Sequence, residues 1–555
     1  MILILNGIIS AVKFLPTTRS ELDGELDVLL VSGDAYVDHP SFGAALLGRR
    51  LQAHGFRVGI ISQPRWDTTD DVKRMGRPRL FAGAASGALD SMLAHYTAFR
   101  KKRHDDAYTP GGRAGARPNR ACIAYTGLLK NAFPGLPVVL GGIEASLRRA
   151  AHYDFWSDSI RRPLLFDSKA DLLVYGMGER AILETARRLQ KKEPLSGIPG
   201  TAFIGEKDGA IHLPSFEDIQ KRPKELMAAT LLLERQMRSG EWATQACGSR
   251  SVVFAPPAEP LSTAEMDELY ALPFTRLPHP SCKEAVPAVD MIQASLTSHR
   301  GCAGGCSFCS LALHQGRRIS SRSRESILEE ARRLARSPFW RGSISDLGGP
   351  SANMWGARCA SDPKKCGRPS CLTPAVCPSF QDDPEALVSL LKALRNVPGV
   401  KHVRVASGVR HDLALRSEAY LRTLVGEFTG GQLKLAPEHS VDRVLRLMRK
   451  PAFSLFERFL SVFERVSRSA GKEQYILPYL ISAFPGCTDA DMRSLSRWLS
   501  ARGWKPKQVQ CFIPTPGTVA SAMFHAGIDP DGKAIPVART DAARLRQHGI
   551  LMGKS

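Results

Sequence analysis

A short loop with three cysteines is the part of the chain whose chemistry is easiest to read. Cys302, Cys306 and Cys309 lie within eight residues, with three glycines in the same loop. Because glycine lets the backbone fold back sharply, the three thiolates can converge on one soft-metal centre. Three thiolates leave one corner of a four-iron cluster open, whereas a structural zinc site needs four ligands. The alternatives are three buried free thiols, or a zinc site completed by His299 or His314.

The spacing of this loop is Cys-x3-Cys-x2-Cys, with Phe308 directly before the last cysteine. This pattern resembles the radical S-adenosylmethionine (SAM) superfamily. The resemblance implies a [4Fe–4S] cluster on the three cysteines, whose open iron chelates the amino and carboxylate groups of SAM. It also implies that an electron from the cluster cleaves the SAM sulfonium to a 5′-deoxyadenosyl radical. Phe308 is then a candidate contact to SAM.

A second group of cysteines follows within nineteen residues: Cys359, Cys366, Cys371 and Cys377. The loop that carries them is rich in Lys, Pro and Arg and has few residues that could build a core. Thiols at this density are more typical of metal ligands than of spare cysteines. The spacing suits either structural zinc or an auxiliary iron–sulfur cluster, and the sequence does not choose between them.

The composition is that of a globular protein with several domains. The chain has 555 residues, of which 43% are hydrophobic and 23% charged, so we expect two or three domains. No run of about twenty apolar residues occurs, so no membrane span is expected. The apolar start, residues 1–5, has no basic segment before it, so no signal peptide is expected. Seven of the twelve cysteines fall in the two groups, which favours metal ligation in a reducing cytoplasm.

The net charge of +22 would suit a polyanionic partner such as RNA or DNA. However, the arginines are spread along the chain, with no long basic block and no aromatic-studded RNA-binding signature, so a nucleic-acid partner is not favoured. Two alternative functions remain open at this point. One is a metal-stabilised nucleic-acid-binding protein, and the other is an RNA-modifying radical SAM methyltransferase or methylthiotransferase.

The N-terminal part, residues 14–194, alternates apolar strands with helices. Residues 27–63 predict a strand, a helix and a second strand, which together form a βαβ unit of a parallel sheet. Further strands are expected at 121–125, 137–141 and 171–175. The pattern predicts a flavodoxin-like or Rossmann-like α/β domain, in which ligands lie beyond the carboxyl ends of the strands.

Several polar residues follow the first strand of this domain, among them Asp34, Tyr36, Asp38 and His39. They are candidate ligand contacts, although Asp38 would serve equally well as the cap of the next helix. The domain resembles the N-terminal domain of cobalamin-dependent radical SAM proteins, where Asp-x-His-x-x-Gly carries the histidine that ligates cobalt. Residues 38–43 differ from this motif in both spacings, so the sequence argues against bound cobalamin.

Residues 195–285 are rich in proline and predict an irregular interdomain segment with one helix near 224–238. Residues 286–520 then alternate strands and helices again, and the last residues, 521–555, read as a short tail. Repeated βα units around a cluster predict a partial parallel (β/α) barrel with its chemistry at the carboxyl ends of the strands. The strands are expected at 343–347, 400–407, 432–436, 474–482 and 508–513.

Turns at these strand ends supply candidate SAM contacts. Gly348 and Gly349 resemble the superfamily turn that binds the SAM amino group through backbone carbonyls. Ser407 and Arg410 suit the ribose and the carboxylate of SAM by hydrogen bonding and charge. Glu438 suits the ribose hydroxyls. Each of these positions would also suit an ordinary βα turn.

Longer stretches agree with one family over residues 14–516. They resemble the YgiQ-type radical SAM family, which is largely uncharacterised. The resemblance implies a [4Fe–4S] cluster with exchangeable SAM, an unknown substrate, and an electron donor such as flavodoxin or ferredoxin. The stretches that carry it are 32–43, 141–149, 298–302, 435–439 and 470–475.

Overall fold

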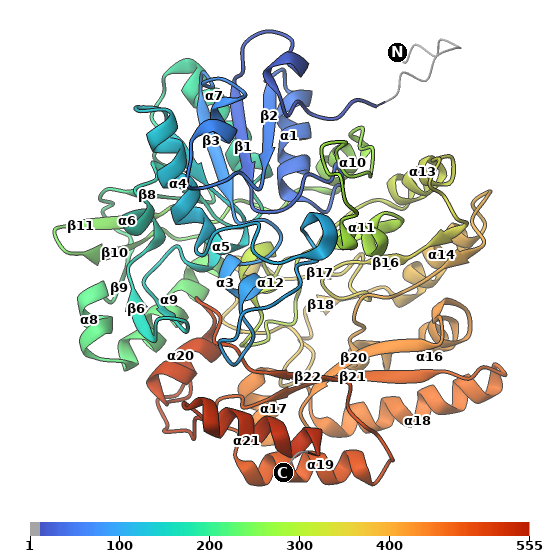
Figure 1. Cartoon of the computed structure of the whole chain (residues 1–555). Helices are drawn as coiled ribbons and strands as arrows, with labels where there is room; N and C mark the ends of the chain where they lie inside the picture. Colours follow the sequence, from blue (N-terminus) through green and yellow to red (C-terminus); the bar gives the residue numbers. More distant parts are fainter. Residues whose placement is uncertain (1–11, 554–555) are drawn as a thin grey trace.

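The computed structural model describes residues 12–553, which form two α/β halves that pack against each other (Figure 1). The N-terminal half is built on one large sheet, and the C-terminal half is an arc of shorter strands with helices outside. Within residues 12–553, no helix is both long and apolar enough to cross a membrane. The start of the chain, where no signal peptide is expected, lies outside the described residues.

The N-terminal sheet has nine strands in the order β2-β1-β3-β4-β7-β8-β11-β10-β9. The first five are parallel, and β1 is buried along its whole length because both of its faces are covered by helices. This confirms the predicted parallel sheet. The five parallel strands are β1 (Val28–Ser32), β2 (Val58–Ser62), β3 (Phe81–Ala85), β4 (Val138–Leu140) and β7 (Leu172–Val174).

Short helices and one hairpin complete this half. From β1 the chain continues to β2 on one side and then to β3 on the other side, so the carboxyl ends of β1 and β3 flank a topological switch point. The elements are α1 (Gly43–Ala53), α2 (Asp70–Lys73), α3 (Ser91–His95), α4 (Ala121–Ala132), α5 (Gly142–Leu147), β5 (His152–Asp154), β6 (Ser159–Arg161), α6 (Leu164–Ser168) and α7 (Glu179–Lys191).

Two expectations about this half were wrong. Residues 121–125, predicted as a strand, form the first turns of α4, because the apolar run continues with helical periodicity to Ala132. Residues 195–285, predicted as irregular, add four strands to the sheet. Among these strands, β11 pairs in antiparallel fashion with both β8 and β10. The elements are β8 (Thr201–Ile204), β9 (Ile211–Leu213), α8 (Phe216–Lys221), α9 (Lys224–Ser239), β10 (Ala243–Cys247), β11 (Arg250–Phe254) and α10 (Thr263–Ala271).

The C-terminal half is the predicted partial barrel. Parallel pairing joins β12 to β16, β15 to β19, and β20 to β21 to β22, and a parallel bridge between Val409 and Leu435 connects the arc. The strands are β12 (Ser295–Thr297), β13 (His299–Arg300), β14 (Ser320–Ser321), β15 (Ser343–Ile344), β16 (Asp346–Gly348), β17 (Arg358–Cys359), β18 (Phe380–Gln381), β19 (His402–Val403), β20 (Gln432–Glu438), β21 (Tyr475–Ser482) and β22 (Gln508–Cys511).

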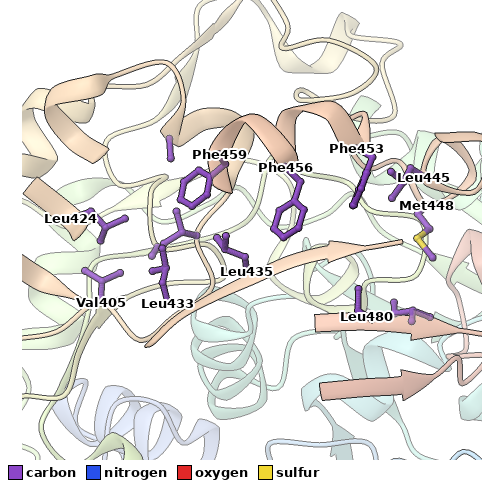
Figure 2. Close-up of a cluster of buried hydrophobic side chains, with 14 of the residues drawn as sticks. Val405, Leu424, Leu433, Leu435, Leu445, Met448, Phe453, Phe456, Phe459 and Leu480 are labelled. Carbon is purple, nitrogen blue, oxygen red and sulfur yellow. The ribbon is translucent and has the colours of Figure 1, made fainter. Parts of the chain in front are cut away.

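Helices cover the outside of this arc, and α18 contributes a row of phenylalanines to its core. Phe453, Phe456 and Phe459 recur at helical spacing on α18; Phe456 and Phe459 face Leu433 and Leu435 of β20, and Phe453 lies beside Met448 (Figure 2). Burying each such side chain contributes about 1.5–3 kcal/mol. The helices are α11 (Pro287–Ile292), α12 (Ser310–Gln315), α13 (Arg324–Ala335), α14 (Pro384–Arg395), α15 (His411–Ala414), α16 (Glu418–Thr423), α17 (Asp442–Met448), α18 (Phe453–Ser469) and α19 (Asp489–Ser500).

The last part of the chain is folded against both halves. Helix α20 (Val519–Ala526) packs against α9 of the N-terminal half, and α21 (Asp541–Met552) packs against α19 and β21 of the barrel. The buried Arg544 of α21 donates a hydrogen bond to the carbonyl of Phe512 at 2.6 Å. Residues 521–553, expected to form a short tail, are therefore packed into the fold.

Candidate active site

The three cysteines lie in the loop between β13 and α12, beyond the carboxyl end of the first barrel strand, β12. Cys309 is the N-cap residue of α12, and its backbone N–H donates to the carbonyl of Cys306 at 3.1 Å. The backbone N–H of Cys302 donates to Gly316 at the other end of α12. Backbone hydrogen bonds thus fix the loop that carries the three cysteines.

Glycines make this turn sterically feasible. Gly305 has a positive φ of 59°, and a side chain there would overlap the carbonyl oxygen of Pro369. A Cβ at Gly304 would lie 3.4 Å from the sulfur of Cys302 and 3.8 Å from that of Cys306. The space between the two sulfurs is therefore kept open by the absence of a side chain.

The three thiols are close enough to interact electrostatically. Burial raises the pKa of Cys309 to about 12, and the thiols of Cys306 and Cys302 act in the same direction. Burial also raises the pKa of Cys302. A cationic metal centre would release these protons and neutralise the mutual repulsion of the thiolates.

The donor set fits a four-iron cluster. Among residues 12–553, no three His, Cys, Asp or Glu side chains are arranged around a single metal ion. A single zinc ion needs that convergence, but a cluster binds each thiolate to a different iron. The three partly buried thiols, two of which lie beside Gly304, therefore suit a cluster with one free iron.

The Gly348–Gly349 turn, which the sequence predicts as a SAM contact, lies beside the cysteine loop. The carboxylate of Asp346 accepts hydrogen bonds from the backbone N–H groups of Ala406 at 2.8 Å and Ser407 at 3.0 Å, and also from the Ser407 hydroxyl. The start of β16 is thereby joined to the turn after β19. Gly348 and Ser407 lie close together, but the Ser407 hydroxyl is already engaged by Asp346. The role of Asp346 was not anticipated from the sequence.

A buried histidine contacts the same turn. The Nδ1 of His299 hydrogen-bonds with the Ser298 hydroxyl at 2.8 Å, and that hydroxyl lies 3.1 Å from the Gly348 carbonyl. The His299 Nε2 is buried and has no hydrogen-bond partner among the described residues. A Cβ at Gly349 would lie 2.7 Å from this nitrogen. The sequence signalled His299 only as an alternative zinc ligand.

The other predicted SAM contacts are distributed around the loop. Arg410 is buried and places Nη1 3.8 Å from the sulfur of Cys306. Glu438 ends β20 with a φ of 68°, an unusual backbone conformation for this residue type, and pairs with Lys450 at 3.5 Å. Burial raises the pKa of Glu438, although Lys450 opposes this effect. Phe308 packs edge-on against Phe484, with 6.1 Å between ring centroids.

The candidate contacts at the N-terminal sheet have internal partners. Asp38 forms a buried ion pair with Arg49 at 2.6 Å, and Phe42, not Asp38, is the N-cap residue of α1. The ring nitrogens of His39 lie beside the backbone N–H of Ser41 and the guanidinium of Arg276. His39 is thus placed as a structural residue, and the expectation that cobalamin is not bound stays a prediction.

A cavity of about 690 Å³ lies between the two halves. Its N-terminal wall includes Ser32 and Asp34 at the switch point, and its barrel wall includes His299, Gly349 and Ser407. The carboxyl ends of both sets of parallel strands therefore face one space. Its volume lies within the range of about 300–1,000 Å³ that is usual for small-molecule sites.

The second cysteine group lies against the first loop, within residues 359–377. The short strands β17 and β18 pair at its base, and Cys359 is exposed while the other three cysteines are partly buried. A second cavity, of about 480 Å³, is lined by cysteines of both groups. The sequence gave no indication that the two groups are neighbours.

Comparison with known proteins agrees with this geometry. A family model described as Radical SAM N-terminal matches residues 14–295. The UPF0313 protein GSU2873 of Geobacter sulfurreducens is 51% identical over 97% of this chain and 92% of that protein. The UPF0313 protein RPA0679 of Rhodopseudomonas palustris is 44% identical over 96% of this chain and 85% of that protein.

One solved structure shares the overall fold. The radical SAM methyltransferase TsrM from Kitasatospora setae, with tryptophan substrate and the SAM analog aza-SAM bound, superposes with a TM-score of 0.50. The sequences are 15% identical, and the match covers 95% of this chain and 88% of that chain. The likeness therefore concerns the fold alone.

The match of residues 14–295 to the Radical SAM N-terminal model places the chain among radical SAM proteins. Within that class, the chain belongs to the UPF0313 family, also known as the YgiQ family. The resemblance found in the sequence is confirmed.

Proposed function

We propose that the protein is a radical SAM enzyme whose cluster is held by Cys302, Cys306 and Cys309. The observation that carries the proposal is the grouping of these three interacting thiols at the carboxyl end of the first barrel strand. When bound there, a [4Fe–4S] cluster with one open iron supplies the electron that cleaves SAM to methionine and a 5′-deoxyadenosyl radical.

The residues around the loop would bind and orient SAM. The Gly348 carbonyl already accepts hydrogen bonds from the backbone N–H and the hydroxyl of Ser298, so the turn would contact the SAM amino group through the Gly349 carbonyl. Asp346 fixes this turn against Ser407. Glu438 suits the ribose hydroxyls, because its buried carboxylate is held beside Lys450. The guanidinium of Arg410 would offset negative charge on the cluster thiolates.

The substrate would enter the cavity between the two halves. This space reaches from the Gly349 turn to the end of β1, so SAM on the barrel side leaves room for an acceptor on the sheet side. Enclosure by both halves would exclude water from a reactive radical. The electron would come from a small carrier protein such as flavodoxin or ferredoxin.

The test is anaerobic reconstitution with iron and sulfide, followed by SAM and dithionite. We expect the wild type to form 5′-deoxyadenosine and methionine, and Cys306→Ala to form neither. Cys247→Ala is the matched control, because Cys247 is a buried free thiol in β10 of the other half. Absence of 5′-deoxyadenosine from wild-type protein with an intact cluster would overturn the proposal.

A further inference from the structure

The second cysteine loop is built directly onto the cluster loop. The Ser370 hydroxyl donates to the carbonyl of Gly304 at 2.6 Å, and the backbone N–H of Cys371 donates to the carbonyl of Ala303 at 3.1 Å. Gly305 has no room for a side chain because Pro369 lies against it. Cys371 is therefore held one backbone hydrogen bond away from the loop that carries Cys302 and Cys306.

The thiols of this loop also form a group among themselves. The backbone N–H of Cys377 donates to the carbonyl of Cys371 at 2.7 Å. The thiols of Cys366 and Cys377 lie close enough to that of Cys371 to interact with it electrostatically. Three of the four cysteines are thus neighbours, and the exposed Cys359 lies at the start of the same loop.

Both cysteine groups face one cavity of about 480 Å³. Its wall includes Cys306 and Cys309 of the first group and Cys359, Cys366 and Cys371 of the second. Cys359 is exposed, whereas the other cysteines of both groups are partly buried. The second group is therefore reachable from the surface and shares a cavity with the proposed cluster.

Guanidinium groups surround the second set of thiols. Arg317 places Nη2 3.6 Å from the sulfur of Cys371, and its buried Nε has no hydrogen-bond partner among the described residues. Arg238 of α9 lies near both Arg317 and Cys366, and burial lowers its pKa with Arg317 acting in the same direction. Hydrogen bonds to sulfur and positive charge stabilise the more negative, reduced state of an iron–sulfur cluster.

The shared cavity has the space for a cluster. Its volume of about 480 Å³ is bounded by Cys359, Cys366 and Cys371, with Cys306 and Cys309 on the same wall. A cluster binds each thiolate to a separate iron, so its ligands stand further apart than the four thiolates that a structural zinc ion draws to about 2.3 Å from one point.

We propose that Cys359, Cys366, Cys371 and Cys377 bind a second iron–sulfur cluster, which passes electrons to the cluster on Cys302, Cys306 and Cys309. The electron role rests on the proposed function. A reduced carrier of the flavodoxin or ferredoxin class gives one electron to the second cluster, which gives it to the first. That electron breaks the C5′–S bond of SAM, yielding methionine and the 5′-deoxyadenosyl radical, and the carrier leaves oxidised by one electron.

Metal content tests the site without any activity. After anaerobic reconstitution and desalting, we expect about eight irons and eight sulfides per chain, and no zinc. Cys371→Ala/Cys377→Ala and Cys306→Ala/Cys309→Ala should each retain about four irons, with different EPR spectra after reduction. About four irons with about one zinc in the wild type, or four irons that Cys371→Ala/Cys377→Ala does not change, would overturn the second cluster.

The electron route has a separate test. The test uses Cys371→Ala/Cys377→Ala that retains the EPR signal of the first cluster. Relative to the wild type, its rate of 5′-deoxyadenosine formation should fall with reduced flavodoxin about tenfold further than it falls with dithionite. Cys247→Ala is the control for loss of a free thiol. An equal effect on both reductants would overturn the route. Failure of the proposed function would be distinguishable, because the wild type would then make no 5′-deoxyadenosine with either reductant.

Discussion

The guanidinium of Arg410 lies 3.8 Å from the sulfur of Cys306, while its Nε and Nη2 hold both carboxylate oxygens of Asp412 at 2.9 and 2.6 Å. All of these groups are at least partly buried. Asp412 therefore fixes the planar fork of Arg410, and the remaining nitrogen is directed at the thiol.

The reduction potential of the proposed first cluster should depend on this contact. Arg410→Lys keeps the charge but loses the fork, so the hydrogen bond to Cys306 is lost and the reduced cluster is less well stabilised. We expect a more negative midpoint potential in an EPR-monitored redox titration. Arg404→Lys is the control, since Arg404 precedes the Ser407 turn and packs against Gly430. An unchanged or more positive potential in Arg410→Lys would contradict this account.

SAM affinity should depend on the fit between Gly349 and His299. In Gly349→Ala the new Cβ would lie 2.5 Å from Cε1 of His299, and overpacking of this kind costs about 1–3 kcal/mol. We expect SAM to bind about tenfold or more weakly in equilibrium dialysis with the reconstituted protein. Gly367→Ala is the control, because no described atom lies within 4 Å of its Cβ position. Adding His299→Ala should relieve the clash and restore part of the SAM affinity. A double variant that binds SAM no more tightly than Gly349→Ala would count against this explanation.

Asp346 should act through the turns that it joins. Asp346→Ala leaves the backbone N–H groups of Ala406 and Ser407 without their acceptor. Ala406 is exposed and Ser407 is half-buried, so water can reach these groups and each lost hydrogen bond costs about 0.5–1.5 kcal/mol. Both Tm and SAM affinity should fall. Asp346→Asn, which keeps one acceptor oxygen, should recover part of both. If Asp346→Ala bound SAM as tightly as the wild type, the joined turns would have no part in the site.

A buried ion triad should support the barrel. Glu330 of α13 pairs with both Arg276 and Arg322, and all three side chains are buried. Glu330→Gln removes the only charge that compensates the two arginines in this triad, which costs about 3–5 kcal/mol. The urea midpoint should fall clearly in this variant. It should stay nearly unchanged in Glu329→Gln, whose partner Arg332 is exposed.

The triad also predicts a pH dependence. Burial alone raises the pKa of Glu330, but Arg322 and Arg276 outweigh it, so the net pKa lies below the usual value. The stabilisation is therefore present above the pKa of an unfolded glutamate and is lost as the pH falls through the lower, folded value. Urea midpoints measured from pH 6 to pH 3 should fall more steeply for the wild type than for Glu330→Gln. Parallel curves would refute this assignment.

Local patterns in the sequence predicted the parts of the fold that depend on neighbouring residues. The apolar runs of β1 and β2, the barrel strands and the cluster loop were found because periodicity and spacing are local signals. The strands β8–β11 were missed because each is short and its partners are distant in the chain. Residues 121–125 were misread because a short apolar run suits a strand and a buried helix equally.

The contacts that define the site are mostly long-range, so the sequence could not supply them. The pairing of Asp346 with Ser407 and the packing of Ser370 on Gly304 join residues about sixty positions apart. The net positive charge of the sequence overstates the positive charge of the surface, because arginines such as Arg322 and Arg544 are fully buried. A nucleic-acid partner stays a prediction, and it was not favoured.

The open iron corner is the central claim, and labelled SAM tests it most directly. Reduced, reconstituted Cys371→Ala/Cys377→Ala, which isolates the first cluster, would be mixed anaerobically with SAM carrying ¹⁵N in its amino group and studied by electron–nuclear double resonance. The account predicts a hyperfine coupling between the cluster and that nitrogen, absent without SAM. An intact cluster that shows no such coupling, with its fourth iron bound by a protein side chain, would contradict it.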